Sequence, residues 1–183
     1  MTGLGAIERV VFSADAIDSR VRALGADISA TYDDRDRLLV LGLLKGSFIF
    51  MADLVRAISV PHQIDFLVAS SYGKGTVSSG EVELRYEPAS SLEGRAVLLV
   101  EDIVDSGTTL AKLRPLLLSM GPASVEVCAL LHKKLPNGAP EPRWVGFDAP
   151  NAFLVGYGLD YAEDFRHLPY IASLTFPPTG SPE

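Results

Sequence analysis

The stretch VLLVEDIVDSGTTL, residues 97–110, combines a strand pattern and a loop pattern around three carboxylates. With Ala96, its first residues form the apolar run AVLLV, which is typical of a strand buried on both faces of a parallel sheet. The small and hydroxyl-bearing residues of DSGTT then lead into a segment with helical spacing. We expect Glu101 and Asp102 just past the carboxyl end of the strand, at the edge where α/β sheets place their ligand sites.

Strand-like and helix-like segments alternate along the rest of the chain. Apolar residues at helical spacing, Ile17, Val21, Leu24 and Ile28, follow a Ser13 cap and predict a first helix. We also expect strands at 38–44, 63–70, 80–86, 125–131, 144–147 and 152–157, and helices at 48–58 and 110–120, the latter bent or shortened by Pro115. This pattern predicts an α/β domain with a central parallel sheet flanked by helices.

Composition narrows the class of protein. A chain of 183 residues, 48% hydrophobic and 21% charged, suits one soluble globular domain. The net charge of -7 disfavours a nucleic-acid surface, and the single Cys128, inside an apolar run, excludes a disulfide framework and a cysteine metal cluster. No apolar run reaches the ~18 residues of a membrane span and the start lacks a signal-peptide layout, so we expect a cytoplasmic protein without membrane contact.

The DSGTT loop suits an anion. Small residues let backbone N–H groups converge on a phosphate, Ser106, Thr108 and Thr109 add hydroxyls, and a helix N-terminus favours negative charge. For any one residue, helix capping by Asp105 or Ser106 is the simpler explanation, but it does not account for the whole combination. A ribose 5-phosphate with a metal-bound group fits both halves, because the acids would then hold the sugar and Mg²⁺.

Four ordered segments carry a family resemblance, whereas the common nucleotide and zinc motifs are absent from the sequence. They are GLLKGSFIFMADL (42–54), DFLVASSYG (65–73), VEDIVDSGTTL (100–110) and FLVGYGLDYAEDFRHLPYI (153–171). The chain resembles the type I phosphoribosyltransferases and, more narrowly, the hypoxanthine-guanine phosphoribosyltransferases, over roughly residues 8–175.

That resemblance implies a fold and an activity. The expected fold is a single domain over residues 1–183, with a core at about 35–150 and a small hood from the chain ends, about 1–15 and 150–175. The implied reaction moves the 5-phosphoribosyl group from phosphoribosyl pyrophosphate to N9 of hypoxanthine or guanine, giving IMP or GMP and pyrophosphate. Mg²⁺ is the implied cofactor, and a homodimer or homotetramer is the implied assembly.

Site residues follow from the same resemblance. Asp105 is the implied general base, and Lys133, or its neighbour Lys134, is the implied donor to the 6-oxygen, with Lys133 favoured. The implied phosphoribosyl pyrophosphate contacts are Lys45, Gly46, Ser71, Tyr72, Glu101, Asp102, Asp105, Ser106, Gly107, Thr108, Thr109 and Arg166. The implied purine contacts are Lys133, Phe153, Leu154 and Asp160. The implied metal ligands are Glu101, Asp102 and Asp160. A cis peptide between Leu44 and Lys45 and a lid at 71–80 complete the expectation.

Two other functions use the same fold. One is an RNA-binding regulator of pyrimidine genes, which the net charge of -7 and the segment FLVGYGLDY disfavour. The other is a non-catalytic nucleotide-binding module, which would need neither Asp105 nor a lid.

Overall fold

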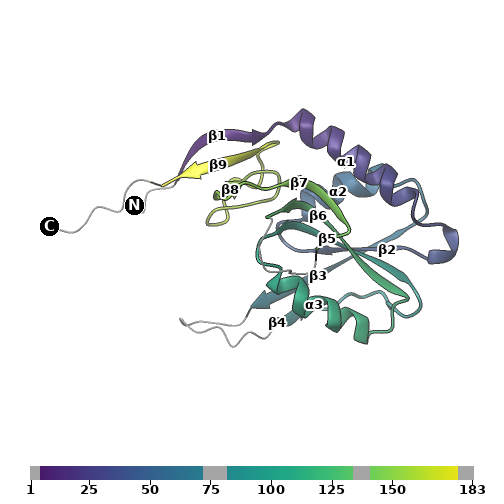
Figure 1. Cartoon of the computed structure of the whole chain (residues 1–183). Coiled ribbons are helices and arrows are strands. Elements are labelled where there is room, and N and C mark those ends of the chain that lie inside the picture. Colours follow the sequence, from purple (N-terminus) through teal and green to yellow (C-terminus); the bar gives the residue numbers. More distant parts are fainter. Residues whose placement is uncertain (1–4, 72–81, 134–140, 177–183) are drawn as a thin grey trace.

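The central sheet has six strands. The computed structural model describes residues 5–71, 82–133 and 141–176 (Figure 1). The strand order is β4-β3-β2-β5-β6-β7, and every pairing is parallel except that of β4 with β3. The strands are β2 (Leu39–Leu43), β3 (Gln63–Ser71), β4 (Val82–Tyr86), β5 (Ala96–Val104), β6 (Ser124–His132) and β7 (Trp144–Asp148). The predicted α/β fold is confirmed.

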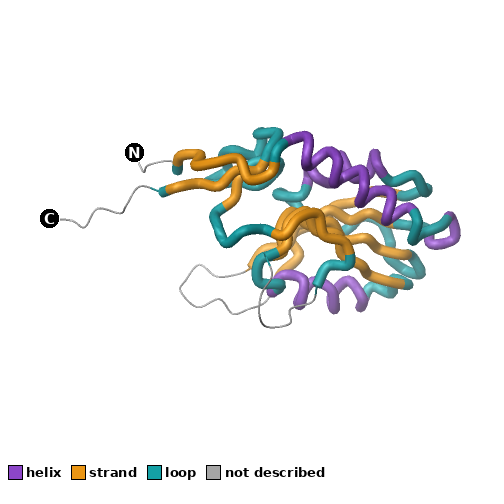
Figure 2. Tube along the Cα trace, turned by 45° about the horizontal axis from the view of Figure 1, so that its top comes forward, coloured by secondary structure: helices purple, strands orange, loops and turns teal. Residues whose placement is uncertain are grey.

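Helices cover both faces of this sheet (Figures 1 and 2). Helices α1 (Ala14–Ser29) and α2 (Phe48–Ala57) lie on one face and α3 (Thr108–Ser119) on the other, and a short 3₁₀ helix, Asp34–Asp36, precedes β2. The Ser13 cap is confirmed, since its side chain accepts a hydrogen bond from the Ala16 amide. Among the described residues, no helix is long and apolar enough to span a membrane.

Burial on both faces explains the apolar run of β5. Leu98 and Val100 pack in the cluster beneath α1 and α2, whereas Val97 and Leu99 pack in the cluster beneath α3. Successive side chains of a strand point to opposite faces, so a strand between two helical layers must be apolar at every position.

The strand β5 is longer than predicted. It runs through Glu101 and Asp102 to Val104, so the expectation that both acids lie beyond the strand is wrong. Pairing with β2 ends at Val100, whereas pairing with β6 continues to the pair Val104 and His132. The two acids are therefore in the part of β5 that extends past β2, hydrogen-bonded on one side only.

Pro115 does not shorten α3. The helix is continuous over twelve residues with Pro115 inside, so the expected shortening is wrong. Proline removes the hydrogen bond to the carbonyl four residues earlier, which belongs to Ala111. Both residues are exposed, so water can bind that carbonyl while Leu110, Leu113 and Leu117 keep the buried face intact.

A second, antiparallel sheet is built from the chain ends. It has the order β1-β9-β8, from β1 (Ala6–Phe12), β8 (Leu154–Val155) and β9 (Ile171–Thr175). Figure 1 shows β1 and β9 side by side, beyond one end of the central sheet; we call this sheet, together with the segment 156–170 that joins β8 to β9, the hood. The strand predicted at 152–157 is cut to two residues because Gly156, Tyr157 and Gly158 have φ values of 97°, 50° and 100°.

Candidate active site

The loop after β5 forms an anion-sized pocket. Its volume is about 90 Å³, and its lining includes Glu101, Asp105, Ser106, Gly107 and Thr109. Gly107, with φ of 68°, occupies the N-cap of α3 and makes no side-chain cap, while the Ser106 hydroxyl, one residue earlier, accepts a hydrogen bond from the Thr108 amide. The amino end of α3 therefore faces the pocket without a carboxylate in that position, which suits a phosphate.

Glu101 and Asp102 have different neighbours. Glu101 is 5% exposed and lines the pocket of the 105–110 loop. The Asp102 carboxylate lies instead against Gly46, where an added Cβ would come within 1.7 Å of Oδ2. Burial raises the pKa of both carboxyl groups, and the Asp102 charge raises that of Glu101 further. Each therefore favours a cation or a hydrogen-bond donor beside it.

The loop that follows β2 contacts both β5 and the hood. The Leu44–Lys45 peptide is cis, as the resemblance implied. Lys45 Nζ lies 3.0 Å from Glu163 Oε2, and both side chains are exposed. A Cβ at Gly158 would come within 2.1 Å of the Gly46 carbonyl oxygen. Glycine is thus required at position 158, where the backbones of the two segments touch, whereas a side chain at position 46 would displace the Asp102 carboxylate.

Arg166 is held by the hood segment. Its Nη2 lies 2.8 Å from Asp160 Oδ1 and 3.3 Å from Glu163 Oε2, and its Nη1 donates to the Gly158 carbonyl. Only 19% of the side chain is exposed, and within the described residues its buried Nε has no hydrogen-bond partner. The guanidinium is fixed in place beside Asp102, whose pKa its charge lowers against the larger effect of burial.

Lys133 and Asp105 form an ion pair. Lys133 Nζ lies 3.1 Å from Asp105 Oδ2, with 20% of the lysine side chain and 61% of the aspartate side chain exposed. The Lys133 amide also donates to the Val104 carbonyl, so the ends of β5 and β6 hold the two residues together. Lys134, the alternative to Lys133, lies outside the described residues.

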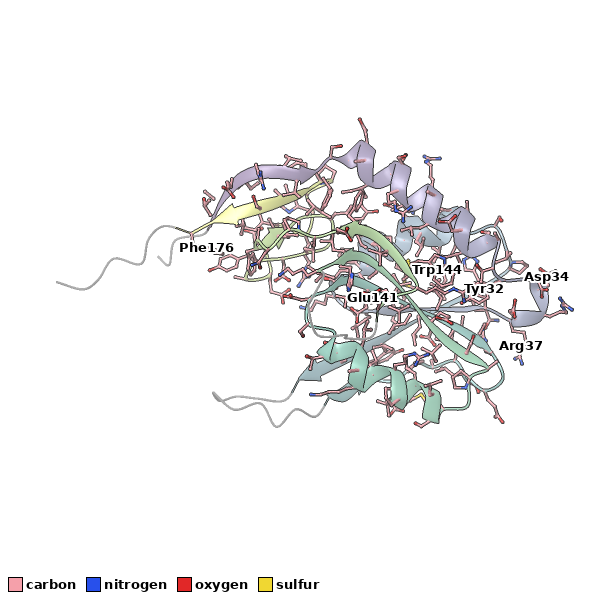
Figure 3. The ribbon with its side chains drawn as sticks, in the orientation of Figure 1. Tyr32, Asp34, Arg37, Glu141, Trp144 and Phe176 are labelled. Carbon is pink, nitrogen blue, oxygen red and sulfur yellow. The ribbon has the colours of Figure 1, made fainter. Side chains whose placement is uncertain are left out.

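An aromatic group projects from the hood. The Phe153 ring is 45% exposed and meets the edges of Tyr161 and Phe176 at centroid distances of 5.4 and 5.6 Å. Phe176 is labelled at the outer end of β9 in Figure 3. From the sequence alone Phe153 would be a core residue, but it presents its ring to solvent, where a planar ligand could stack.

The backbone polar groups of Leu154 do not pair with β9. The Leu174 amide donates to the Phe153 carbonyl, so Phe153 and Leu174 are a hydrogen-bonded pair of the antiparallel ladder. The next pair, Leu154 and Ser173, must then be a non-hydrogen-bonded one. Because β8 is the edge strand of the hood, the N–H and C=O of Leu154 point away from β9 and can bind a partner.

Comparison with known proteins accounts for this arrangement. The family model described as a phosphoribosyl transferase domain matches residues 13–162. The chain is 42% identical over 176 residues to a hypoxanthine phosphoribosyltransferase of Buchnera aphidicola, covering 92% of this chain and 96% of that one. It is 44% identical to a hypoxanthine-guanine phosphoribosyltransferase of Dictyostelium discoideum, covering 90% and 94%. The chain belongs to the hypoxanthine phosphoribosyltransferase family.

A solved structure supports the same assignment. The crystal structure of a hypoxanthine phosphoribosyltransferase from Staphylococcus aureus superposes with a TM-score of 0.86, at 41% identity and 92% coverage of each chain. The likeness covers most of each chain, so the chain has the fold of this transferase family.

Some expected transferase contacts are not brought together. Ser71 ends β3, whereas Tyr72 and the rest of the lid expected at 71–80 lie outside the described residues. Within the described ranges, no three carboxylate, imidazole or thiolate side chains form a ready metal site, so the set of Glu101, Asp102 and Asp160 does not converge on one point. Asp102 and Asp160 do interact, since the Asp160 charge contributes to raising the pKa of Asp102.

Sequence reasoning missed three side chains of this phosphoribosyltransferase site. Glu163 touches Lys45 and Arg166, and Tyr161 and Phe176 touch the Phe153 ring. Tyr161 and Glu163 lie inside the matching segment FLVGYGLDYAEDFRHLPYI, so the motif held the signal for both. Phe176 lies beyond that segment, and nothing in its spacing indicates the contact.

Proposed function

We propose that the protein transfers the 5-phosphoribosyl group of phosphoribosyl pyrophosphate to N9 of hypoxanthine or guanine. The products are IMP or GMP and pyrophosphate. The observation that carries this proposal is the Asp105–Lys133 pair at the mouth of the anion pocket, because it joins a phosphate loop to groups that can recognise a purine. Family membership makes the protein a purine salvage transferase.

The sugar phosphate would bind at the loop after β5. Ser106 to Thr109 would supply hydroxyls and the amino end of α3 for the 5-phosphate, as supported by the pocket that Ser106, Gly107 and Thr109 line. Glu101 and Asp102 would accept hydrogen bonds from the ribose hydroxyls, which would satisfy two acids whose pKa values burial raises.

The pyrophosphate would bind between the β2 loop and the hood. Lys45 and Arg166 are the available cations, with the Gly46 backbone between Asp102 and Gly158. Glu163 Oε2 lies 3.0 Å from Lys45 Nζ and 3.3 Å from Arg166 Nη2. A pyrophosphate oxygen that bound both cations would replace this carboxylate oxygen.

Mg²⁺ suits the acids of this site. Asp102 and Asp160 offer the hard oxygen ligands that Mg²⁺ prefers, and their mutual repulsion would be relieved by a cation. The buried Glu101 is the third proposed contact. When bound, Mg²⁺ would neutralise charge on the leaving pyrophosphate. Because Asp160 Oδ1 lies against Arg166 and Oδ2 accepts from the Glu163 amide, ligation by Asp160 would require these contacts to change.

The purine would lie between the hood and the Asp105–Lys133 pair. Phe153 offers its exposed ring face, and the edge backbone of Leu154 offers a donor and an acceptor to the purine edge. Lys133 would donate to the 6-oxygen, and Asp105 would accept the N7 proton as N9 attacks C1 of the ribose. Exclusion of water by a lid at 71–80 would prevent hydrolysis of the sugar.

The broader organisation completes the proposal. We propose a single transferase domain over residues 1–183, with the core at about 35–150 and the hood from the chain ends. A homodimer or homotetramer in the cytoplasm, without nucleic-acid or membrane partners, remains the expectation from sequence.

A substrate panel tests the function. The purified protein is assayed with phosphoribosyl pyrophosphate and Mg²⁺ against hypoxanthine, guanine, xanthine, adenine and uracil, with each nucleotide product identified. Formation of IMP and GMP supports the proposal. A preference for uracil, or an absence of product with every base, would overturn it.

A further inference from the structure

A second pocket lies at the end of the central sheet opposite the transferase site, where the parallel strands begin. It has a volume of about 350 Å³, and its lining includes Asp34, Arg37, His62, Gln63 and Arg95. Arg37 lies just before β2, His62 just before β3 and Arg95 just before β5, so the pocket sits at the amino ends of three adjacent parallel strands. Figure 3 places Asp34 and Arg37 at the end of the molecule opposite Phe176.

The separation of the two pockets is large. Strand β5 has nine residues, with Arg95 at one end and Asp105 just beyond the other. At ~3.3 Å per residue the strand spans about 25 to 30 Å. A ligand of this second pocket therefore does not touch the loop at 105–109.

Arg95 places a cation without a counter-charge in the pocket wall. Its side chain is buried, with 6% exposed, and it donates to the Arg37 and Leu38 carbonyls and to Gln63 Oε1. These bonds use three of the five N–H groups of a guanidinium. Within the described ranges no carboxylate pairs with it, and its pKa is lowered by burial and then by the nearby Arg37 charge.

The other donors of the pocket are also available. Arg37 is exposed, has φ of 50°, and makes no side-chain hydrogen bond or ion pair within the described ranges. His62 Nδ1 contacts the Val60 carbonyl, which leaves its Nε2 for a ligand. Asp34 is the acidic residue of the lining, and no ion pair joins it to either arginine. Two guanidiniums thus share one pocket in a protein whose net charge is -7.

We propose that this pocket is a second anion site that binds a phosphoryl group through Arg37, Arg95, His62 and Gln63. Guanidinium groups match phosphate oxygens with paired N–H donors, and an anion would relieve the repulsion between the two arginines. The volume accommodates inorganic phosphate or a small phosphorylated metabolite. Arg95 alone could be a structural clamp of backbone carbonyls, but this would not explain the unpaired Arg37 beside it.

Backbone amide chemical shifts of the ¹⁵N-labelled full chain test the proposal. The protein is titrated with inorganic phosphate, with ribose 5-phosphate, and with chloride at matched ionic strength. We expect two separate sets of shifts, one at 105–109 and one at 37, 62, 63 and 95. Saturation of the second set by inorganic phosphate identifies a free phosphate site, and tighter saturation by ribose 5-phosphate identifies a sugar phosphate site.

Two arginine variants distinguish specific binding in this pocket from a general effect of surface charge. Arg37→Gln should weaken binding at the second set at least about tenfold and leave the set at 105–109 unchanged. Arg37→Lys, which keeps the charge without the paired donors, should fall between this variant and the wild type. Arg35→Gln is the matched control, because Arg35 lies in the same turn, pairs with Asp33 and is almost fully exposed.

Two results would overturn the proposal. One is the absence of shifts at 37, 62, 63 and 95 beyond those caused by chloride. The other is equal weakening by Arg35→Gln and Arg37→Gln, which would indicate screening of surface charge. Neither result bears on the transferase function, because the amides at 105–109 report on that site separately.

Discussion

The ammonium group of Lys133 lies 3.1 Å from Asp105 Oδ2. Each residue directly follows one of two paired strands, β6 and β5, and the pair of Val104 with His132 sets them side by side. The two charges neutralise each other. A 6-oxopurine would draw the ammonium to its oxygen and the carboxylate to its N7 proton, so substitution of either residue alters the surroundings of the other.

The first prediction concerns Asp105. Asp105→Asn removes the proton acceptor but keeps the size of the side chain, so kcat should fall by about 10² to 10⁴ while substrate KM values change little. Steady-state kinetics with hypoxanthine measure this, with Asp15→Asn, at the start of α1, as the control. A kcat equal to that of the wild type would remove Asp105 from the chemistry.

The second prediction concerns the contact between Gly46 and Asp102. A Cβ at position 46 would come within 1.7 Å of Asp102 Oδ2, so Gly46→Ala must move the carboxylate. Displacement of a site group by about 1 Å can cost about 10²-fold, and we expect a loss of this size in kcat/KM for phosphoribosyl pyrophosphate. Circular dichroism should show an unchanged fold. Activity within twofold of the wild type would mean that the position of Asp102 does not matter.

The third prediction concerns the metal. A site that gathers Asp102, Asp160 and the buried Glu101 needs more positive charge than Lys45 and Arg166 supply to hold a highly anionic substrate. Activity should therefore vanish when all divalent metal is chelated and return when Mg²⁺ is added in excess. Turnover that persists under complete chelation would contradict the assignment of Mg²⁺.

The fourth prediction concerns Glu163. Its carboxylate contacts Lys45 and Arg166, and the Lys45 hydrogen bond, followed by that of Arg166, lowers its pKa. Glu163→Gln should free both cations for pyrophosphate, but exposed ion pairs are weak because solvent screens them. The KM for phosphoribosyl pyrophosphate should thus fall by no more than about fivefold at low salt. Asp164→Asn is the neighbouring control, and a higher KM in Glu163→Gln would show that Glu163 assists binding.

Local patterns were enough to predict the core of the fold. The run at 96–100 is apolar at every position because helices pack on both faces of β5. The spacing of Ile17, Val21, Leu24 and Ile28 predicted α1 because these side chains form its buried stripe. Such signals depend only on neighbours within one element, so a single sequence carries them.

Features set by distant pairing could not be predicted in the same way. The end of β5 depends on β6, which continues past the end of β2. Strand β1 is exposed along most of its length and owes its form to pairing with β9, as in the contact of Ala6 with Thr175. The roles of Glu163 and Phe176 likewise depend on partners in other segments of the chain.

The last prediction is that adenine is rejected, and it rests on hydrogen-bond polarity at purine position 6. A 6-oxopurine presents an acceptor there, whereas adenine presents an amino group that donates. The Lys133 ammonium, which is 20% exposed, can only donate. Adenine would offer Lys133 no acceptor at this position and would set two donors against each other, and polar mismatches of this kind discriminate by as much as roughly 10⁴ to 10⁵.

Lys133→Ala separates the contribution of this lysine from that of the rest of the pocket. The substitution should lower kcat/KM for hypoxanthine and guanine and narrow their advantage over adenine, because the lost donor served only the oxo bases. Lys134→Ala is the control, since it removes the same charge one residue away. If only Lys134→Ala changes the ratio, the reaction stands and the base contact belongs to Lys134. If the wild type already uses adenine well, the assignment of a 6-oxopurine substrate is wrong, because a donor at this position would then select nothing.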